Sequence, residues 1–138
     1  MERQLLTAAR RGWDPVAVCG FVCEDNCPYG QWCGGCRGPM CCCSYATLFE
    51  DGKCPHVKCA YAKGLHGCWQ CPELDDCRVG FFGMENEYLA KASCRFARKY
   101  GEGRLLALLR NATERKMSVI DPAGTEATLA LLEKLYRS

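Results

Sequence analysis

The sequence predicts a mainly α-helical protein with a small, irregular, cysteine-rich N-terminal half that is stapled by metal and an α-helical C-terminal half. Two observations lead to this prediction. The chain has 138 residues and 14 cysteines, and every cysteine lies between Cys19 and Cys94. Glycine and proline interrupt the cysteine-rich part, whereas apolar residues recur at helical spacing after it. A chain of this size is expected to form one compact domain.

We expect three parts along the chain. Residues 1–18 form a lead-in that contains a short helix at 2–11, residues 19–80 are the cysteine-rich metal-binding region, and residues 81–138 are a helical region packed on it. In the cysteine-rich region, short helices are expected at 57–63 and at 72–78, the latter with proline as its first residue. A segment this broken buries too little apolar surface to order itself, so ligated cysteines are expected to staple it.

The C-terminal region carries three predicted helices. Residues 84–100 form the first, which stops at Gly101, and residues 102–116 form the second. Asp121 and Pro122 are expected to start the third, because Asp caps free amide groups and Pro suits the first helical position. We expect the apolar stripes of these helices to form core rather than a binding groove. The stripes contain Tyr88, Leu89, Ala92, Phe96, Tyr100, Leu105, Leu106, Leu108, Leu109, Ala112, Thr128, Leu129, Leu131, Leu132, Leu135 and Tyr136.

The spacing of the cysteines predicts metal binding. A Cys-x-x-Cys turn places two thiolates on one ion, and a second pair completes the four ligands of a structural zinc site. Two clusters of this kind predict about two Zn²⁺ per chain. Iron–sulfur clusters also use four cysteines, so an iron–sulfur protein is the alternative. The candidate ligands are Cys19, Cys23, Cys27, Cys33 and Cys36 in the first cluster, and Cys54, Cys59, Cys68, Cys71 and Cys77 in the second.

Within the second cluster, Cys68 and Cys71 form the Cys-x-x-Cys pair. Cys54 and Cys59 are its expected partners, and Cys77 competes for one of the two places. In the first cluster, Cys33 and Cys36 form the corresponding pair.

Other residues could take part in the chemistry of these clusters. His56 or His66 could replace a thiolate, but five cysteines are already nearby, so we expect both to be hydrogen-bonded or solvated loop residues. The triplet Cys41–Cys43 cannot comfortably place three sulfurs on one ion, and we expect at least two of its thiols to be dispensable. Cys94 is expected to be a small buried residue rather than a ligand.

Charge and motifs exclude several classes of function. No serine-nucleophile motif, phosphate-binding glycine loop or H-E-x-x-H pattern occurs, so the sequence does not favour an enzyme. Residues 19–80 have a net charge of −2, which two four-thiolate zinc sites would lower to about −6. This argues against nucleic acid as a partner, since phosphate contacts dominate its affinity. The modest basic patch of the helical region consists of Arg95, Arg98, Lys99 and Arg104.

The compartment is inferred from the first residues and from the thiols. No apolar run is long enough for a transmembrane helix, so no membrane is expected. Residues 1–11 lack the apolar stretch of a secretory signal. We therefore expect a cytoplasmic protein with thiols that are reduced or bound to metal.

The motifs of both clusters resemble those of a known family. The second cluster, from Cys54 to Cys77, reads CPHVKCAYAKGLHGCWQCPELDDC. With the motifs of the first cluster and of the helical region, it is similar to the uncharacterised, cysteine-rich domain-of-unknown-function family 3795 of bacteria and archaea, over roughly residues 17–136. The other motifs are Cys19-Gly-Phe-Val-Cys23, Cys27-Pro-Tyr, Cys33-Gly-Gly-Cys36, Gly80-Phe-Phe, Lys91-Ala and Arg98-Lys-Tyr-Gly101.

This resemblance implies a cytosolic, metal-binding module with no assigned reaction. The sequence departs from the family pattern at the triplet Cys41–Cys43 and by one extra residue between Cys23 and Cys27. The function that the sequence favours is a non-catalytic zinc-binding module that acts as an interaction or regulatory protein on an unknown protein partner. The alternative is an iron–sulfur protein that passes electrons to a partner enzyme.

Overall fold

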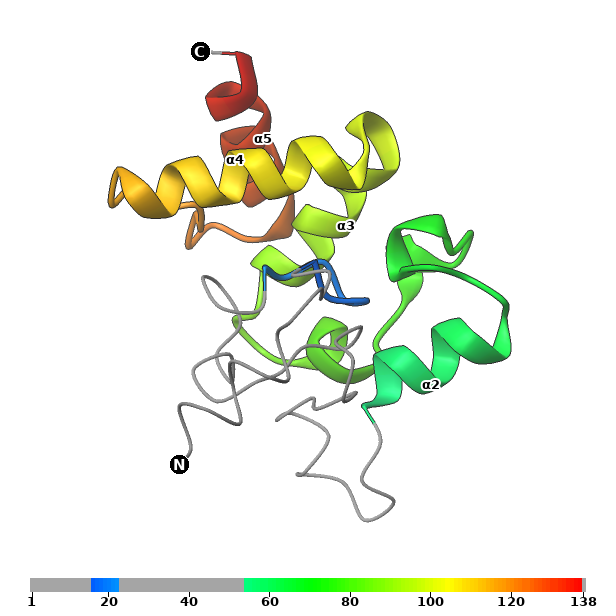
Figure 1. The fold of residues 1–138 in the computed structure, drawn as a ribbon. Coiled ribbons are helices and arrows are strands. Elements are labelled where there is room, and N and C mark those ends of the chain that lie inside the picture. Colours follow the sequence, from blue (N-terminus) through cyan, green and yellow to red (C-terminus); the bar gives the residue numbers. More distant parts are fainter. Residues whose placement is uncertain (1–15, 23–53, 138) are drawn as a thin grey trace, which may run out of the picture.

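The structure is a computed structural model that describes residues 16–22 and 54–137. In these ranges the protein is mainly helical, as predicted, with β-pairing limited to an isolated bridge between Val16 and Val22 (Figure 1). The described part contains no helix with the length and apolar character needed to cross a membrane. The expected helix at 2–11, the triplet Cys41–Cys43 and four candidate ligands lie outside the described residues. These four ligands are Cys23, Cys27, Cys33 and Cys36.

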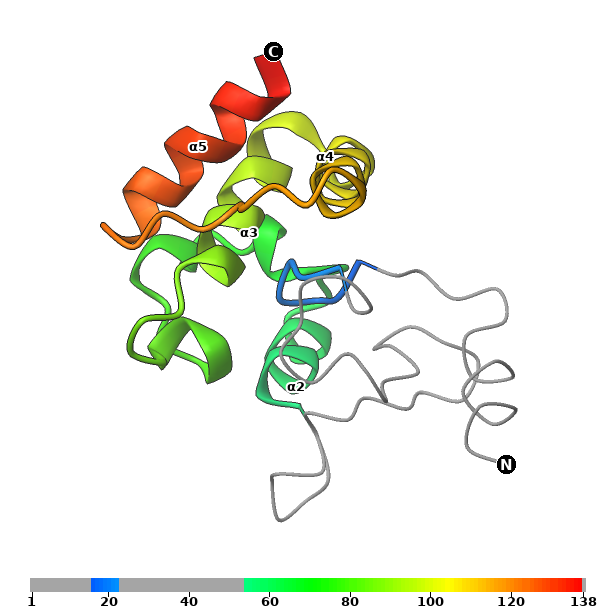
Figure 2. The same cartoon turned by 90° about the vertical axis from the view of Figure 1, so that its left-hand side faces the viewer.

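Helix α3 (Leu89–Tyr100) is the centre of the described structure (Figure 2). Helices α4 (Glu102–Glu114) and α5 (Thr125–Arg137) pack against it, and three short 3₁₀ turns contact it as well. The turns are η3 (Cys68–Gln70), η4 (Leu74–Asp76) and η5 (Gly80–Gly83). Helix α3 therefore connects the C-terminal helices to the cysteine-rich region.

The predicted apolar stripes form the core of the three C-terminal helices. The fully buried side chains include Leu89 and Phe96 of α3, Leu105 and Leu109 of α4, and Leu132 of α5. The rings of Tyr100 and Tyr136 pack on Phe96 at centroid distances of 4.7 and 5.4 Å and join α3 to α5.

Two helices begin later than the sequence predicts. Helix α3 begins at Leu89 because the Glu87 carboxylate accepts hydrogen bonds from the backbone N–H groups of Leu89 (3.1 Å) and Ala90 (3.4 Å), which cap the helix there. Helix α5 begins at Thr125 rather than after Asp121, because the Asp121 carboxylate accepts the N–H of Ala123 at 2.9 Å and closes a turn before the helix.

The short elements of the cysteine-rich region agree in part with the prediction. Helix α2 (Pro55–Ala62) covers most of the helix predicted at 57–63, and Pro55 supplies its first residue. The prediction of a helix at 72–78 is wrong, since only the single turn η4 forms there. The backbone returns to extended conformation at Cys71 and Cys77, on either side of this turn.

The N-terminal segment 16–22 packs between η3 and α3. The backbone N–H of Cys68 donates to Val18 O at 2.9 Å, and the thiol of Cys94 donates to Cys19 O at 3.2 Å. Gly20 adopts φ +92°, and a Cβ there would lie 2.9 Å from Cys94 Sγ, so glycine is required for this close approach. Cys94 is fully buried, as predicted.

Replacing Thr128 by Val should destabilise the fold. The Thr128 hydroxyl, buried at the start of α5, accepts the backbone N–H of Asp121 at 3.1 Å and donates to Gly124 O at 2.8 Å. Because Val leaves the Asp121 N–H without this acceptor, we expect the free energy of unfolding to fall by about 1–3 kcal/mol. Thr113→Val is the control, since Thr113 is exposed and should change this free energy by at most about 0.5 kcal/mol. Urea denaturation that found equal losses would contradict this account of the start of α5.

Candidate metal centre

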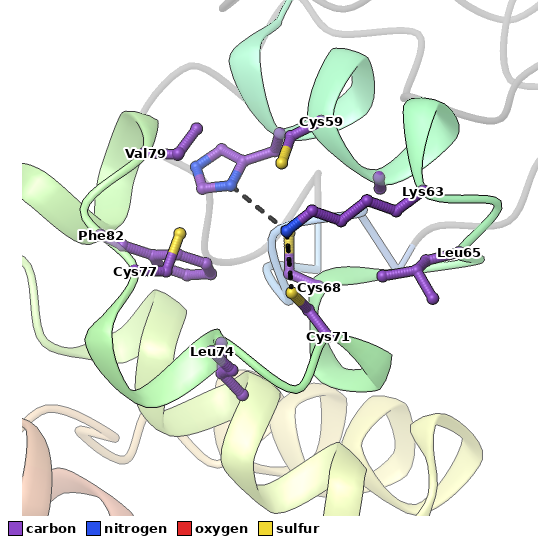
Figure 3. Close-up of a pocket in the computed structure, with 11 residues that line it drawn as sticks. Cys59, Lys63, Leu65, Cys68, Cys71, Leu74, Cys77, Val79 and Phe82 are labelled. Carbon is purple, nitrogen blue, oxygen red and sulfur yellow. Dashed lines mark hydrogen bonds between the residues drawn. The ribbon is translucent and has the colours of Figure 1, made fainter.

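Four cysteines and one histidine of the second cluster line a single cavity of about 20 Å³ (Figure 3). This volume has room for about one atom of the size of a water molecule. The residues that can bind or orient an ion there are His56, Cys59, Cys68, Cys71 and Cys77. The remaining wall is formed by Lys63 and by the apolar side chains of Ala60, Leu65, Leu74, Val79 and Phe82.

Three different elements supply the four cysteines. Cys59 comes from α2, Cys68 begins the turn η3 and Cys71 follows it, and Cys77 follows η4. The Cys-x-x-Cys pair is held by its own backbone, because the N–H of Cys71 donates to Cys68 O at 3.1 Å. The structure thus brings together four of the five candidate ligands of the second cluster.

The remaining candidate ligands and histidines lie elsewhere. Cys54 is buried at the N-terminal end of α2 and does not line the cavity. Cys19 is buried in the segment beside η3. His66 is half-exposed, 3.4 Å from the Glu102 carboxylate, and so lies outside the cavity as well. No disulfide joins any two of the cysteines in the described ranges.

The cysteines of the cavity influence one another electrostatically. Burial raises the pKa of Cys68 to about 12, and negative charge on Cys77, Cys59, Cys71 and Cys54 adds to this rise. The thiolates would therefore repel one another if they ionised without a cation. In the described ranges, no group of three or more His, Cys, Asp or Glu side chains is already arranged to hold a metal ion.

Lys63 brings a positive charge to the cavity. Its ammonium group reaches in from the end of α2 and donates to Cys71 Sγ at 3.4 Å (Figure 3). It also donates to Glu73 Oε2 at 3.3 Å. The hydrogen bond to Cys71 raises the pKa of Lys63 to about 12, so this charge is permanent near neutral pH. Sequence reasoning missed Lys63; its place four residues after Cys59 on a predicted helix was the available signal.

Helix α3 holds the loop that carries Cys77. Lys91 donates from Nζ to Cys77 O at 2.7 Å and to Asp75 O at 3.3 Å. Arg95 and Arg98, one and two turns further along the helix, bind the Asp75 carboxylate at 2.9 and 3.1 Å. The hydrogen bond from Arg98 lowers the pKa of Asp75. These cations share one face of α3, and from the sequence two of them, Arg95 and Arg98, are expected only to contribute to a basic patch.

His56 is fully buried against the cavity. Its ring stacks on Phe81 at a centroid distance of 5.7 Å and meets the edge of Phe82 at 4.6 Å. Gly80, with φ +54°, allows this packing, because a Cβ at that position would lie 2.5 Å from His56 Nε2. The expectation of a loop residue is wrong, because His56 is buried in helix α2. Its expected hydrogen bonding agrees with the bond that the Phe81 N–H donates to Nε2.

Comparisons of the chain with protein-family models, with curated proteins and with solved structures found no match. The resemblance to family 3795 therefore stays a prediction.

Gly80→Ala should disrupt the wall of the cavity. The new methyl group would collide with His56, and the left-handed backbone adds strain of about 1–2 kcal/mol. Gly64→Ala is a matched control, because Gly64 also has a left-handed φ of +70° but no atom within 4 Å of its Cβ position. We expect Gly80→Ala to lower the free energy of unfolding clearly more than Gly64→Ala in urea denaturation. Equal losses would show that Gly80 does not hold His56 in place.

Proposed function

We propose that the protein is a non-catalytic zinc-binding module in which Cys59, Cys68, Cys71 and Cys77 hold one Zn²⁺. The observation that carries this proposal is the convergence of four thiols from three separate elements on a cavity with room for about one ion. Four thiolates are the ligand set of a structural zinc site. This set takes Cys77 as the fourth ligand in place of Cys54.

Binding requires the thiols to turn toward a common centre. A cysteine side chain reaches a new position by rotation about one bond between staggered rotamers, so the backbone need not move far. The ion must also displace the thiol protons, and its positive charge then removes the repulsion between the thiolates. Lys63 offsets part of the net charge of −2 that a zinc ion with four thiolates carries.

An iron–sulfur cluster on the same four cysteines is the alternative, and the metal content decides between the two. Four protein thiolates fill the coordination of zinc completely. A catalytic zinc site keeps one position open for water or substrate, so the proposed ligand set supports a structural role.

The wider role is that of an interaction or regulatory module for a protein partner, in the reducing cytoplasm where its thiols remain available to metal. The first cluster, with Cys19 and the four ligands outside the described residues, would hold a second zinc ion. Nucleic acid is a poor partner, because three of the four basic residues of α3 are already matched by carboxylates and the fourth, Lys91, binds backbone carbonyl oxygens. Arg95 contacts Asp75 and Glu126, Arg98 contacts Asp75, and Lys99 contacts Glu133.

Elemental analysis of untagged protein purified without oxygen tests the identity of the metal. We expect about two zinc ions per chain and a colourless solution, because zinc has a filled d shell. A brown protein with stoichiometric iron and acid-labile sulfide would show that the bound group is an iron–sulfur cluster and not zinc. Protein that carries no metal after purification and takes up none would contradict both the zinc and the iron–sulfur assignment.

Substitution of single cysteines tests the ligand set. Cys68→Ser or Cys77→Ser should lose one equivalent of zinc, since a mostly protonated hydroxyl binds zinc poorly. Cys94→Ser is the matched control: Cys94 is buried, like Cys68, but lies outside the cavity, and serine can still donate to Cys19 O. It should retain all zinc and cost at most about 1–3 kcal/mol of stability. Retention of full zinc by Cys68→Ser, with loss by Cys94→Ser, would refute this ligand set.

A further inference from the structure

Both ring nitrogens of His56 face polar groups of the protein. Nε2 lies 2.9 Å from the backbone nitrogen of Phe81, and Nδ1 lies 3.5 Å from Cys68 Sγ. The ring is fully buried and fixed between Phe81 and Phe82. Neither nitrogen can therefore turn toward a different partner without breaking one of these contacts.

The contact with Phe81 decides which nitrogen carries the proton. A backbone N–H can only donate, so Nε2 must accept with its lone pair. A neutral imidazole has one protonated and one unprotonated nitrogen, which places the proton of His56 on Nδ1. The contact between Nδ1 and Cys68 is then a hydrogen bond from N–H to sulfur.

We propose that His56 is a positioning residue of the metal centre, which donates a hydrogen bond from Nδ1 to the Cys68 sulfur and does not bind the ion itself. This inference rests on the zinc site proposed above. A donor beside a ligating sulfur stabilises the thiolate and fixes its orientation. Sulfur ligands accept such bonds readily when burial keeps water away, and Cys68 is only 8% exposed.

The proposal explains why the histidine is held so tightly. Phe81 supplies the N–H that selects the tautomer, and Gly80 leaves room for the ring. Groups that orient a metal ligand in this way typically change metal affinity 10–100-fold when they are removed. His56 would thus adjust the strength with which the site binds zinc, although it supplies no ligand.

Two substitutions separate the contact with sulfur from the contact with the backbone. In His56→Asn the amide nitrogen takes the place of Nδ1, so the donor to Cys68 is kept and the acceptor for Phe81 is lost. In His56→Gln the amide group takes the place of Nε2, so the acceptor for Phe81 is kept and the donor to Cys68 is lost. Both variants are loaded with Co²⁺, because its bonds to thiolate give an absorption band that reports on the sulfur electrons.

We expect His56→Gln to shift this band to longer wavelength and to weaken Co²⁺ binding by about 10–100-fold. The reason is that a sulfur atom without its hydrogen bond holds its electrons less tightly. His56→Asn should keep the band and the affinity near those of the wild-type protein, even if it lowers stability. The opposite pattern, with a normal band in His56→Gln and a shifted band in His56→Asn, would overturn the proposal.

Nitrogen NMR of the unmodified chain tests the tautomer without any substitution, so the proposal remains testable if a variant does not fold. We expect a proton on Nδ1 of His56 and none on Nε2, both with and without bound metal. A proton on Nε2, or direct coordination of either nitrogen to the ion, would overturn the proposal. A chain that binds no Co²⁺ at all would instead refute the proposed metal site, while the NMR result would still decide the role of His56.

Discussion

Four thiols share a cavity of about 20 Å³, and this crowding is the constraint on which the cysteine-rich region depends. Burial already raises the pKa of Cys68 to about 12, so its thiolate is costly unless a positive charge lies nearby. Two groups of the protein supply part of the compensation: the ammonium group of Lys63 and the proposed N–H donor of His56. A divalent cation among the sulfurs would supply the rest.

The chain around the cavity contains little regular secondary structure that could stabilise it. One α-helix of eight residues and three 3₁₀ turns make up the regular structure of residues 54–83. Helix α3 provides the rigid element beside them. Its Lys91 and Arg95 fix the loop of Cys77, while Cys94 anchors the backbone of Cys19. If the proposed zinc ion binds here, it would contribute on the order of 10 kcal/mol, a stabilisation as large as that of a typical domain.

The sequence predicted the structure correctly where a repeating pattern of residues determines which side chains are buried. The helical apolar stripes predicted the core of α3, α4 and α5. Of the four cysteines that the spacing favoured for one site, Cys59, Cys68 and Cys71 line the same cavity and Cys54 does not. The sequence favoured Cys54 over Cys77 as a partner of Cys59, whereas the structure places Cys77 and not Cys54 in the wall of the cavity. The place of Cys77 depends on how the turn η4 and the side chain of Lys91 direct the chain, which its spacing in the sequence does not reveal. The sequence did not predict the contacts behind the proposed role of His56, since its partner Phe81 is 25 residues away.

The sequence also predicted the ends of several helices incorrectly. Glu87 and Asp121 accept backbone N–H groups within short turns, and these local bonds delay the start of α3 and α5. A helix was expected at 72–78 because Pro72 suits a first position, yet the chain leaves helical geometry again at Cys77. An extended backbone at Cys71 and Cys77 directs both residues toward the cavity.

The central claim, that Cys59, Cys68, Cys71 and Cys77 bind one ion, is tested most directly by NMR of the protein loaded with an NMR-active cadmium isotope. Through-bond coupling from cadmium to the β protons of its ligands identifies each ligating cysteine. The account predicts a cadmium resonance typical of four sulfur ligands that couples to these four residues and not to Cys54 or Cys94. Coupling to Cys54 in place of Cys77, or to a histidine nitrogen, would contradict it.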